Sequence, residues 1–234
     1  MSNVMTIFKK EMRTYFTSPI AYVVLTIFLV FCGIFFSMPL FLNNQASMRG
    51  AFSIILYAFT LFVPAITMRL ISEEKKSGTF ELLATMPISD MQVILGKFLA
   101  AVTLLMIAVG LTGTYAITVS LLGEVDAGEI FSGYVGLALL GSAYVAIGIC
   151  ASSLTENQIV AFLLSLAVIL FLTFIDKLVS FLPIGGASIF EYLGAEFHFR
   201  NIERGVLDTR DVVYYASLIF LGLYFSALAL KRRF

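Results

Sequence analysis

Residues that commonly perform metal, redox or acid–base chemistry are scarce in this sequence. The single histidine, His198, cannot form a histidine-rich metal site and is expected to be a polar residue at an interface. The two cysteines, Cys32 and Cys150, lie in apolar segments, where a thiol acts as a small hydrophobe rather than as a disulfide partner or metal ligand. Tryptophan is absent. We therefore expect no catalytic, cofactor-binding or metal site in this chain.

Charged residues are also few. They make up 13% of the 234 residues and their formal net charge is zero, which gives no reason to expect a nucleic-acid partner. Hydrophobic residues make up 60%, and the mean hydropathy of +0.98 far exceeds what a water-soluble domain needs to form one core. The composition therefore predicts a polytopic membrane protein.

Six apolar segments are long enough to cross a bilayer as helices, which takes roughly 20 residues. They contain no Asp, Glu, Lys or Arg, and they cover residues 20–42, 51–68, 98–122, 130–154, 158–175 and 212–230. The second and fifth are short and are expected to extend into their flanks. The sequence thus predicts an all-α membrane protein with six transmembrane helices, built as one domain over residues 1–234.

The distribution of charge predicts the orientation. An even number of spans places both termini on one side, and the positive-inside rule selects that side. With both termini cytoplasmic, ten of the 15 Lys and Arg residues lie inside and five lie outside, whereas nine of the 15 acidic residues lie outside. We therefore expect cytoplasmic termini.

Residues 1–18 have the pattern of an amphipathic helix that lies on the inner leaflet, with its basic residues mainly off the apolar stripe. A signal peptide is the alternative, but the following apolar block is too long and lacks a small-residue cleavage pattern, so we expect this segment to be retained. Pro19 marks the turn into the first span. The apolar stripe consists of Val4, Ile7, Phe8, Met12 and Tyr15.

The loop 69–97, which closes with Gly96 and Lys97, has the most polar residues and contains the signals of two short helices. Ser72 can cap the first helix and Gly78 can end it in a left-handed conformation. Thr79 can cap the second, which Pro87 ends. One face of this second helix is apolar and needs a cover; it presents Phe80, Leu83 and Met86.

This loop resembles the signature loop of ABC-2 type transporter permeases. The shared spacing is Glu-x-x-x-Gly-Thr-x-Glu-x-Leu-x-x-x-Pro, met here at Glu74, Gly78, Thr79, Glu81, Leu83 and Pro87. Residues 198–215 and 151–158 are similar, more narrowly, to the permeases associated with gliding motility and with nitrous-oxide-reductase maturation. The resemblance covers essentially the whole chain and implies the ABC-2 type exporter fold in the bacterial cytoplasmic (inner) membrane.

The resemblance also implies that the loop is a coupling helix, seated on a separate ABC ATPase subunit. The residues that would form this contact are Glu73, Glu74, Gly78, Thr79, Phe80, Glu81, Leu82, Leu83 and Pro87. The alternative is a solvated loop with ordinary helix stops. By the same resemblance, the complex would contain two ATPase copies and a second permease subunit, either a copy of this chain or a related protein.

The chain has no nucleotide-binding motif of its own. Its one Gly-Lys pair, Gly96-Lys97, is followed by Phe98, and Met91 occupies the position of the first glycine of a Walker A motif. ATP and Mg are therefore expected in the partner ATPase, and the chain is not expected to be an enzyme. Glu73-Glu74 resembles the glutamate pair of a membrane protease family, but the arginine and histidines which that family requires are missing.

The outer segment 183–211 is expected to form a re-entrant or surface helix with Phe190, Leu193 and Phe197 on one face. Gly205 would end this helix, and Asp208 would cap the last span. It could act either as a gate at the exit or as a lid over the bundle. Asp176 and Lys177 are expected to be interface anchors.

Two functions remain open at this point. The first is transport, in which small residues of the fourth span, among them Gly136, Gly141 and Gly148, allow close helix contact. The lack of charge within the spans argues against a secondary transporter. The second is a non-transporting anchor or assembly subunit of an ATP-driven envelope machine. A partner with a large extracytoplasmic domain would fit either function, and membrane lipid surrounds the chain in both.

Overall fold

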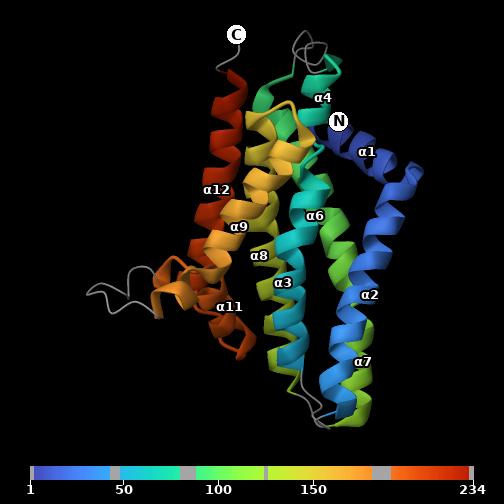
Figure 1. The fold of residues 1–234 in the computed structure, drawn as a ribbon, viewed down its shortest axis with the longest axis vertical. Coiled ribbons are helices and arrows are strands. Elements are labelled where there is room, and N and C mark those ends of the chain that lie inside the picture. Colours follow the sequence, from blue (N-terminus) through green and yellow to red (C-terminus); the bar gives the residue numbers. More distant parts are fainter. Residues whose placement is uncertain (1–2, 43–47, 80–87, 124–125, 181–190, 232–234) are drawn as a thin grey trace.

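The computed structural model describes residues 3–42, 48–79, 88–123, 126–180 and 191–231, which form helices and no strand (Figure 1). The helices run in the order α1 (Asn3–Thr17), α2 (Pro19–Leu42), α3 (Met48–Thr67), α4 (Ser72–Lys76), α6 (Asp90–Leu111), α7 (Gly113–Leu122), α8 (Ala127–Leu154), α9 (Gln158–Ser180), α11 (Ala195–Glu203) and α12 (Thr209–Lys231).

Six helical stretches within the described ranges are long and apolar enough to cross a membrane, which confirms the predicted fold class. They correspond to α2, α3 with α4, α6 with α7, α8, α9 and α12. The two short spans do extend, since α3 begins at Met48 and α9 continues to Ser180. In Figure 1, α1, α4 and the C-terminal end of α12 lie at the same end of the bundle, as an even number of spans requires.

The third span begins earlier than predicted. Asp90 is its first residue because Ser89 and Gln92 form a capping box: the Ser89 hydroxyl accepts from the Gln92 backbone N–H, and the Gln92 side chain accepts from the Ser89 N–H. Gly96 and Lys97 therefore lie inside α6, and the prediction that they close the loop is wrong. The polar residues of this segment had suggested a loop, but the capping box starts a helix there.

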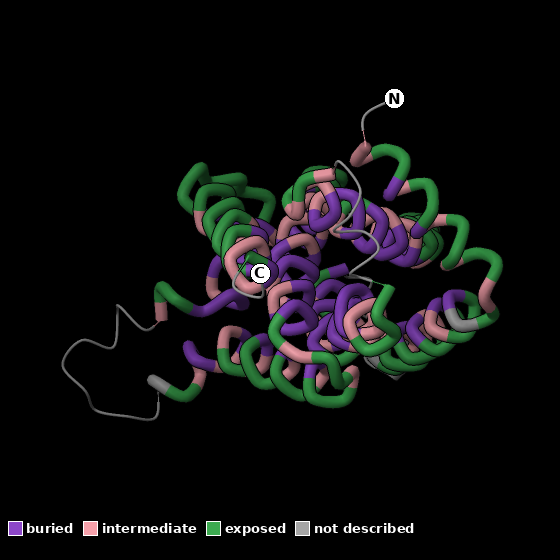
Figure 2. Tube along the Cα trace, turned by 90° about the horizontal axis from the view of Figure 1, so that it is seen from above, coloured by how far each residue is buried: buried purple, intermediate pink, exposed green. Residues whose placement is uncertain are grey.

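α8 is the central helix of the bundle. Viewed along the bundle, buried residues occupy the middle and exposed ones the periphery (Figure 2). A Cβ atom on Gly141 or Gly148 would lie closer than 3.0 Å to side chains of α3 or α6, and one on Gly136 would meet Ile202 of α11 at 2.9 Å. The predicted role of these glycines in close helix contact is confirmed.

α1 is amphipathic as predicted, but protein covers part of its apolar stripe. Its buried residues are Ile7 and Glu11, whereas Lys9, Lys10 and Arg13 are exposed. A Cβ on Gly96 of α6 would approach the Ile7 side chain to 2.7 Å, so α1 lies directly against α6. The stripe therefore packs on the first turns of the third span.

The contact between α12 and α8 gives the first testable prediction. A Cβ on Gly222 would lie 2.9 Å from the backbone carbon and oxygen of Ala146, which cannot move as a flexible side chain can. Gly222→Ala is expected to destabilise the protein by about 1–3 kcal/mol, measured as a lower Tm in detergent. Gly110→Ala is the matched control, because a Cβ there meets nothing within 4 Å and alanine favours helix. Equal Tm values for the two variants would contradict this packing.

Candidate functional site

The candidate site is the start of the loop between the second and third spans, together with the groups that hold it. Ser152 of α8 fixes the turn that precedes α4: its hydroxyl accepts from the backbone N–H groups of Ile71 at 3.1 Å and Ser72 at 3.0 Å, and donates to the Met68 carbonyl at 3.0 Å. α4 is therefore held against the centre of the bundle.

The predicted capping role of Ser72 is wrong. The residue before α4 is Ile71, which makes no side-chain cap, and the Ser72 hydroxyl donates back to the Met68 carbonyl. The physical reason is that a turn joins α4 closely to α3, so an α8 hydroxyl satisfies the N–H groups that a free helix end would leave open. The predicted role of Gly78 is confirmed, because its φ is +71°.

The second predicted helix of the loop lies largely outside the described residues, which end at 79 and resume at 88. Thr79 is described: its hydroxyl donates to the Glu74 carbonyl at 3.3 Å and lies 2.9 Å from the Ser77 hydroxyl. The proposed ATPase contacts that fall outside the described residues are Phe80, Glu81, Leu82, Leu83 and Pro87.

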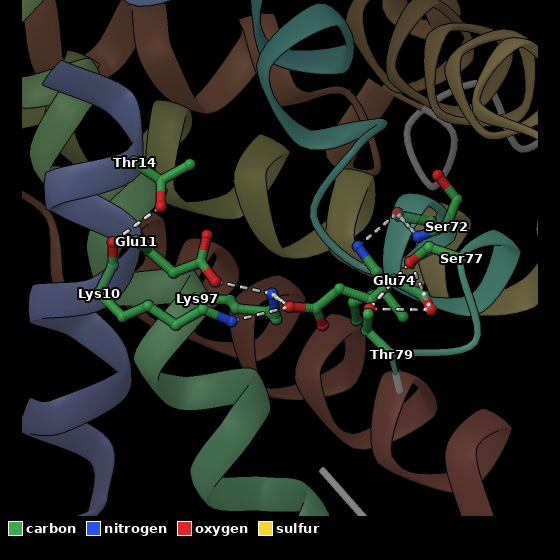
Figure 3. Close-up of polar contacts among 10 residues, drawn as sticks. Lys10, Glu11, Thr14, Ser72, Glu74, Ser77, Thr79 and Lys97 are labelled. Carbon is green, nitrogen blue, oxygen red and sulfur yellow. Dashed lines mark hydrogen bonds and ion pairs between the residues drawn. The ribbon is translucent and has the colours of Figure 1, made fainter. Parts of the chain in front are cut away.

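A buried lysine joins this loop to two other helices (Figure 3). Lys97 of α6 is 2% exposed, and its Nζ lies 2.9 Å from Glu11 Oε1 of α1 and 2.9 Å from Glu74 Oε1 of α4. Lys10 of α1 approaches the same Glu74 oxygen at 3.4 Å. A buried charge is tolerated only when it is paired, so this cluster fixes the relative positions of α1, α4 and α6.

Sequence reasoning missed this cluster, although one signal was present. Glu11 is the only acidic residue on the apolar stripe of α1, between Phe8 and Met12. A carboxylate on the buried face of an amphipathic helix requires a cationic partner. The partner could not be identified from sequence, because Lys97 is 86 residues away.

The neighbouring Glu73 is in a different environment. It pairs with Arg69 one turn earlier, with Nε 2.9 Å from Oε2 and with both side chains more than one third exposed. An exposed pair of this kind contributes little to stability, about 0.3–0.5 kcal/mol. Glu73 thus lies at the surface of the loop, whereas Glu74 points to the interior.

A second polar cluster lies on α11 and the end of α9. Glu196 accepts a hydrogen bond from Tyr57 at 2.9 Å and pairs with Lys177 at 2.9 Å and Arg200 at 2.7 Å. Arg200 also reaches Asp176 at 3.2 Å. Burial by itself would raise the pKa of Glu196, but the hydrogen bonds from Lys177 and Arg200 outweigh it and lower the pKa. Asp176 and Lys177 therefore hold α11 in place.

The prediction that Phe190, Leu193 and Phe197 lie on one helical face does not hold for Leu193, which precedes α11 and is 46% exposed. Phe190 lies outside the described residues. α11 begins only at Ala195, and it buries Ala195, Glu196, His198, Phe199 and Ile202. The predictions for its end are confirmed: Gly205 has a φ of +93°, and the Asp208 side chain accepts from the Arg210 N–H at 2.9 Å.

His198, predicted to be a polar residue at an interface, is fully buried within the protein. Its Nδ1 lies 2.6 Å from Asp211 Oδ1 of α12, its Nε2 lies 2.9 Å from the Tyr192 carbonyl, and its ring stacks on Tyr214. This pairing selects which face of α11 is buried. Within the described ranges, no group of three or more His, Cys, Asp or Glu residues could hold a metal ion.

The fold and these clusters define a multi-pass helical membrane protein with a polar loop held rigidly at one end of the bundle. The ABC-2 family transporter protein family matches residues 5–191, and the chain belongs to this family. It is thus a permease subunit of an ABC transporter, a membrane transport component that is not itself catalytic and that associates with an ABC ATPase. A search of curated proteins found no match.

The lysine cluster gives a prediction on stability. Lys97→Met would leave Glu11 and Glu74 buried without their cation, so it is expected to destabilise the protein by roughly 3 kcal/mol. The triple variant Glu11→Gln, Glu74→Gln and Lys97→Met removes all three charges and should recover most of that loss. Unfolding of both variants in the same detergent measures the difference. A triple variant no more stable than Lys97→Met would contradict the buried pairing.

Glu203 at the end of α11 gives a prediction on pH. Burial raises the pKa of Glu203 to about 7, against the influence of Arg49, Arg200 and Arg204. A carboxyl whose pKa is raised in the folded state contributes its full stability below its unfolded pKa and loses it as pH rises through about 7. Glu203→Gln avoids this loss, so its Tm relative to the native chain should rise by about 2–4 °C between pH 5 and pH 8.

The control for this pH experiment is Gly110→Ala, which changes no ionisable group and whose Cβ would meet no described atom within 4 Å. Its Tm relative to the native chain should therefore not depend on pH. If the Tm difference between Glu203→Gln and the native chain is the same at pH 5 and at pH 8, the burial of this carboxyl is contradicted.

Proposed function

We propose that this permease forms a translocation path and that its loop 72–87 is the coupling helix seated on the ABC ATPase. The observation that carries this proposal is the position of Glu74. Its carboxylate contacts Lys97 of α6 at 2.9 Å and Lys10 of α1 at 3.4 Å, so the loop is tied to both helices (Figure 3).

Transmission of movement requires such a rigid connection. Interfaces and packed cores change between discrete arrangements rather than deforming continuously, so a displacement of α4 must be passed to its partners. Lys97 would pass it to the third span and to α1, and Ser152 would pass it to α8. Glu73, whose side chain is partly exposed, is available for a charged contact with the ATPase.

The sequence supports the remaining parts of this proposal. The excess of Lys and Arg on one side supports cytoplasmic termini, and the family is compatible with the bacterial inner membrane that we propose. The complex would contain two ATPase copies, which hold ATP and Mg, and a second permease subunit. We also propose that the chain belongs to the branch of permeases associated with gliding motility and nitrous-oxide-reductase maturation, which the similarity of residues 151–158 and 198–215 supports.

Co-purification with the ATPase tests the coupling loop. Phe80→Asp together with Leu83→Asp places two charges on its predicted apolar face and should abolish co-purification, because that face would be buried in the complex. Phe80→Tyr with Leu83→Met keeps the face apolar and is the matched control. An ATPase that remains bound to the aspartate variant would show that the loop is not its docking element.

The transmission step has a separate test in the same complex. The triple variant Glu11→Gln, Glu74→Gln and Lys97→Met should still bind the ATPase but should reduce the permease-dependent stimulation of ATP hydrolysis at least several-fold. Native stimulation with the triple variant would show that the charged cluster only supports the fold.

A further inference from the structure

A cavity of about 250 Å³ lies where α1 turns into α2, and its walls come from α1, α2, α3, α4 and α6. Its lining includes both charged and apolar residues. The charged lining residues are Lys10, Glu11, Arg69, Glu73, Glu74 and Lys97, and the apolar ones are Ala21, Val24, Ala65, Ile66, Leu70 and Leu104. Such a lining fits a molecule that has a charged head and a hydrocarbon portion.

The charges of this lining balance each other. Three cations face three carboxylates, and each charged group has a partner: Lys97 pairs with Glu11 and Glu74, Lys10 with Glu74, and Arg69 with Glu73. A guest with a net charge would add a charge that no group of this balanced lining compensates. The lining therefore favours a zwitterion over an anion or a cation.

Two of the lining residues, Tyr15 and Glu74, each have a buried polar atom without a hydrogen-bond partner within the described chain: the Tyr15 hydroxyl and Glu74 Oε2. Burial raises the pKa of Tyr15 well above its ordinary range, so the hydroxyl keeps its proton and can donate. Glu74 Oε2 can accept. An unsatisfied buried group is unfavourable, and a ligand that supplies an acceptor for Tyr15 and a donor for Glu74 removes both deficits.

A phosphoethanolamine group has these two complementary features. Its phosphate oxygens accept hydrogen bonds, and its primary ammonium donates them; the two are joined by two carbons and together form a zwitterion. The Tyr15 hydroxyl would donate to the phosphate, and Glu74 Oε2 would accept from the ammonium. A trimethylammonium group, by contrast, has no N–H to offer.

The size and position of the cavity indicate where the rest of the ligand lies. A volume of about 250 Å³ equals that of roughly eight water molecules in the liquid, enough for a headgroup and its first carbons but not for two acyl chains. The exposed apolar side chains of α2 begin next to the lining residue Val24, with Val23 and Ile27 both more than half exposed. Acyl chains can therefore continue along α2 into the bilayer.

We propose that this cavity is a binding site for the headgroup of phosphatidylethanolamine, held between the interfacial helix α1 and the start of the coupling loop. The ligand would bridge Tyr15 of α1 and Glu74 of α4. This proposal does not depend on ATPase docking, and its test uses the full-length permease alone.

The test is lipid retention. The purified chain is placed in nanodiscs that contain equal parts of phosphatidylethanolamine, phosphatidylcholine and phosphatidylglycerol, then extracted into detergent, and its bound lipids are identified by native mass spectrometry. Selective retention of phosphatidylethanolamine is expected. Tyr15→Phe removes only a hydroxyl without a partner, so it should leave the Tm unchanged or higher and reduce that retention about ten-fold.

The matched control is Tyr22→Phe, at a neighbouring tyrosine whose hydroxyl donates to the Phe16 carbonyl and which does not line the cavity. It should retain phosphatidylethanolamine as the native chain does. Free phosphoethanolamine is added as a competitor: weak competition shows that the acyl chains contribute, and complete displacement at low concentration would mean that the site takes the free headgroup instead of the lipid.

Three results would overturn the proposal. Equal retention of phosphatidylcholine would show that no ammonium N–H is recognised, and preferred retention of phosphatidylglycerol would show an anion site. Absence of bound lipid, with Tyr15→Phe indistinguishable from the native chain, would show that the cavity holds only water. A loss of coupling in complexes that still retain the lipid would concern the proposed function and not this site.

Discussion

The close approach of neighbouring helices to α8 is the packing constraint on which the remaining structure depends. Lipid tails are as apolar as leucine, so helices in a membrane associate through close packing rather than through hydrophobic exclusion from water. The small residues of α8 make this approach possible, because glycines face side chains of α3, α6 and α11, and the backbone at Ala146 faces Gly222 of α12. This packing fixes where α3, α6, α11 and α12 lie, and therefore where their polar side chains can meet.

The two short helices α4 and α11 are then attached by buried polar and charged groups. α4 is held by Lys97 and Ser152, and α11 is held by Lys177, Asp176 and the pair between His198 and Asp211. Replacing buried ion pairs with apolar groups is often neutral, whereas breaking one is costly. We infer that these pairs chiefly specify where α4 and α11 sit, which is what a coupling element and an outer segment require.

The inner cluster also gives α1 a role beyond anchoring at the membrane surface. Glu11 of α1 and Glu74 of α4 share one lysine, and the cavity beside them is closed on one side by the turn between α1 and α2. The conformation of the loop, the position of α1 and the content of the cavity are therefore physically linked. If both proposals hold, the ATPase and the lipid would act on the same few residues.

The sequence by itself determined the six spans, the amphipathic α1, the left-handed Gly78 and Gly205 and the cap at Asp208. These features depend on hydropathy, on backbone conformation or on partners within a few residues, so local pattern is sufficient. It also contained the loop signature that indicated the family. The start of the third span also depends on a local signal, the capping box of Ser89 and Gln92.

Only the tertiary structure decided the partners of Ser72, Glu74, Lys97 and His198. Ser152 is 80 residues from Ser72, and Lys97 is 86 residues from Glu11, so no local pattern relates them. The buried face of α11 is likewise set by contacts with α8, α9 and α12 rather than by its own periodicity. A buried polar group must find a partner, but the chain fold alone determines which one lies within reach.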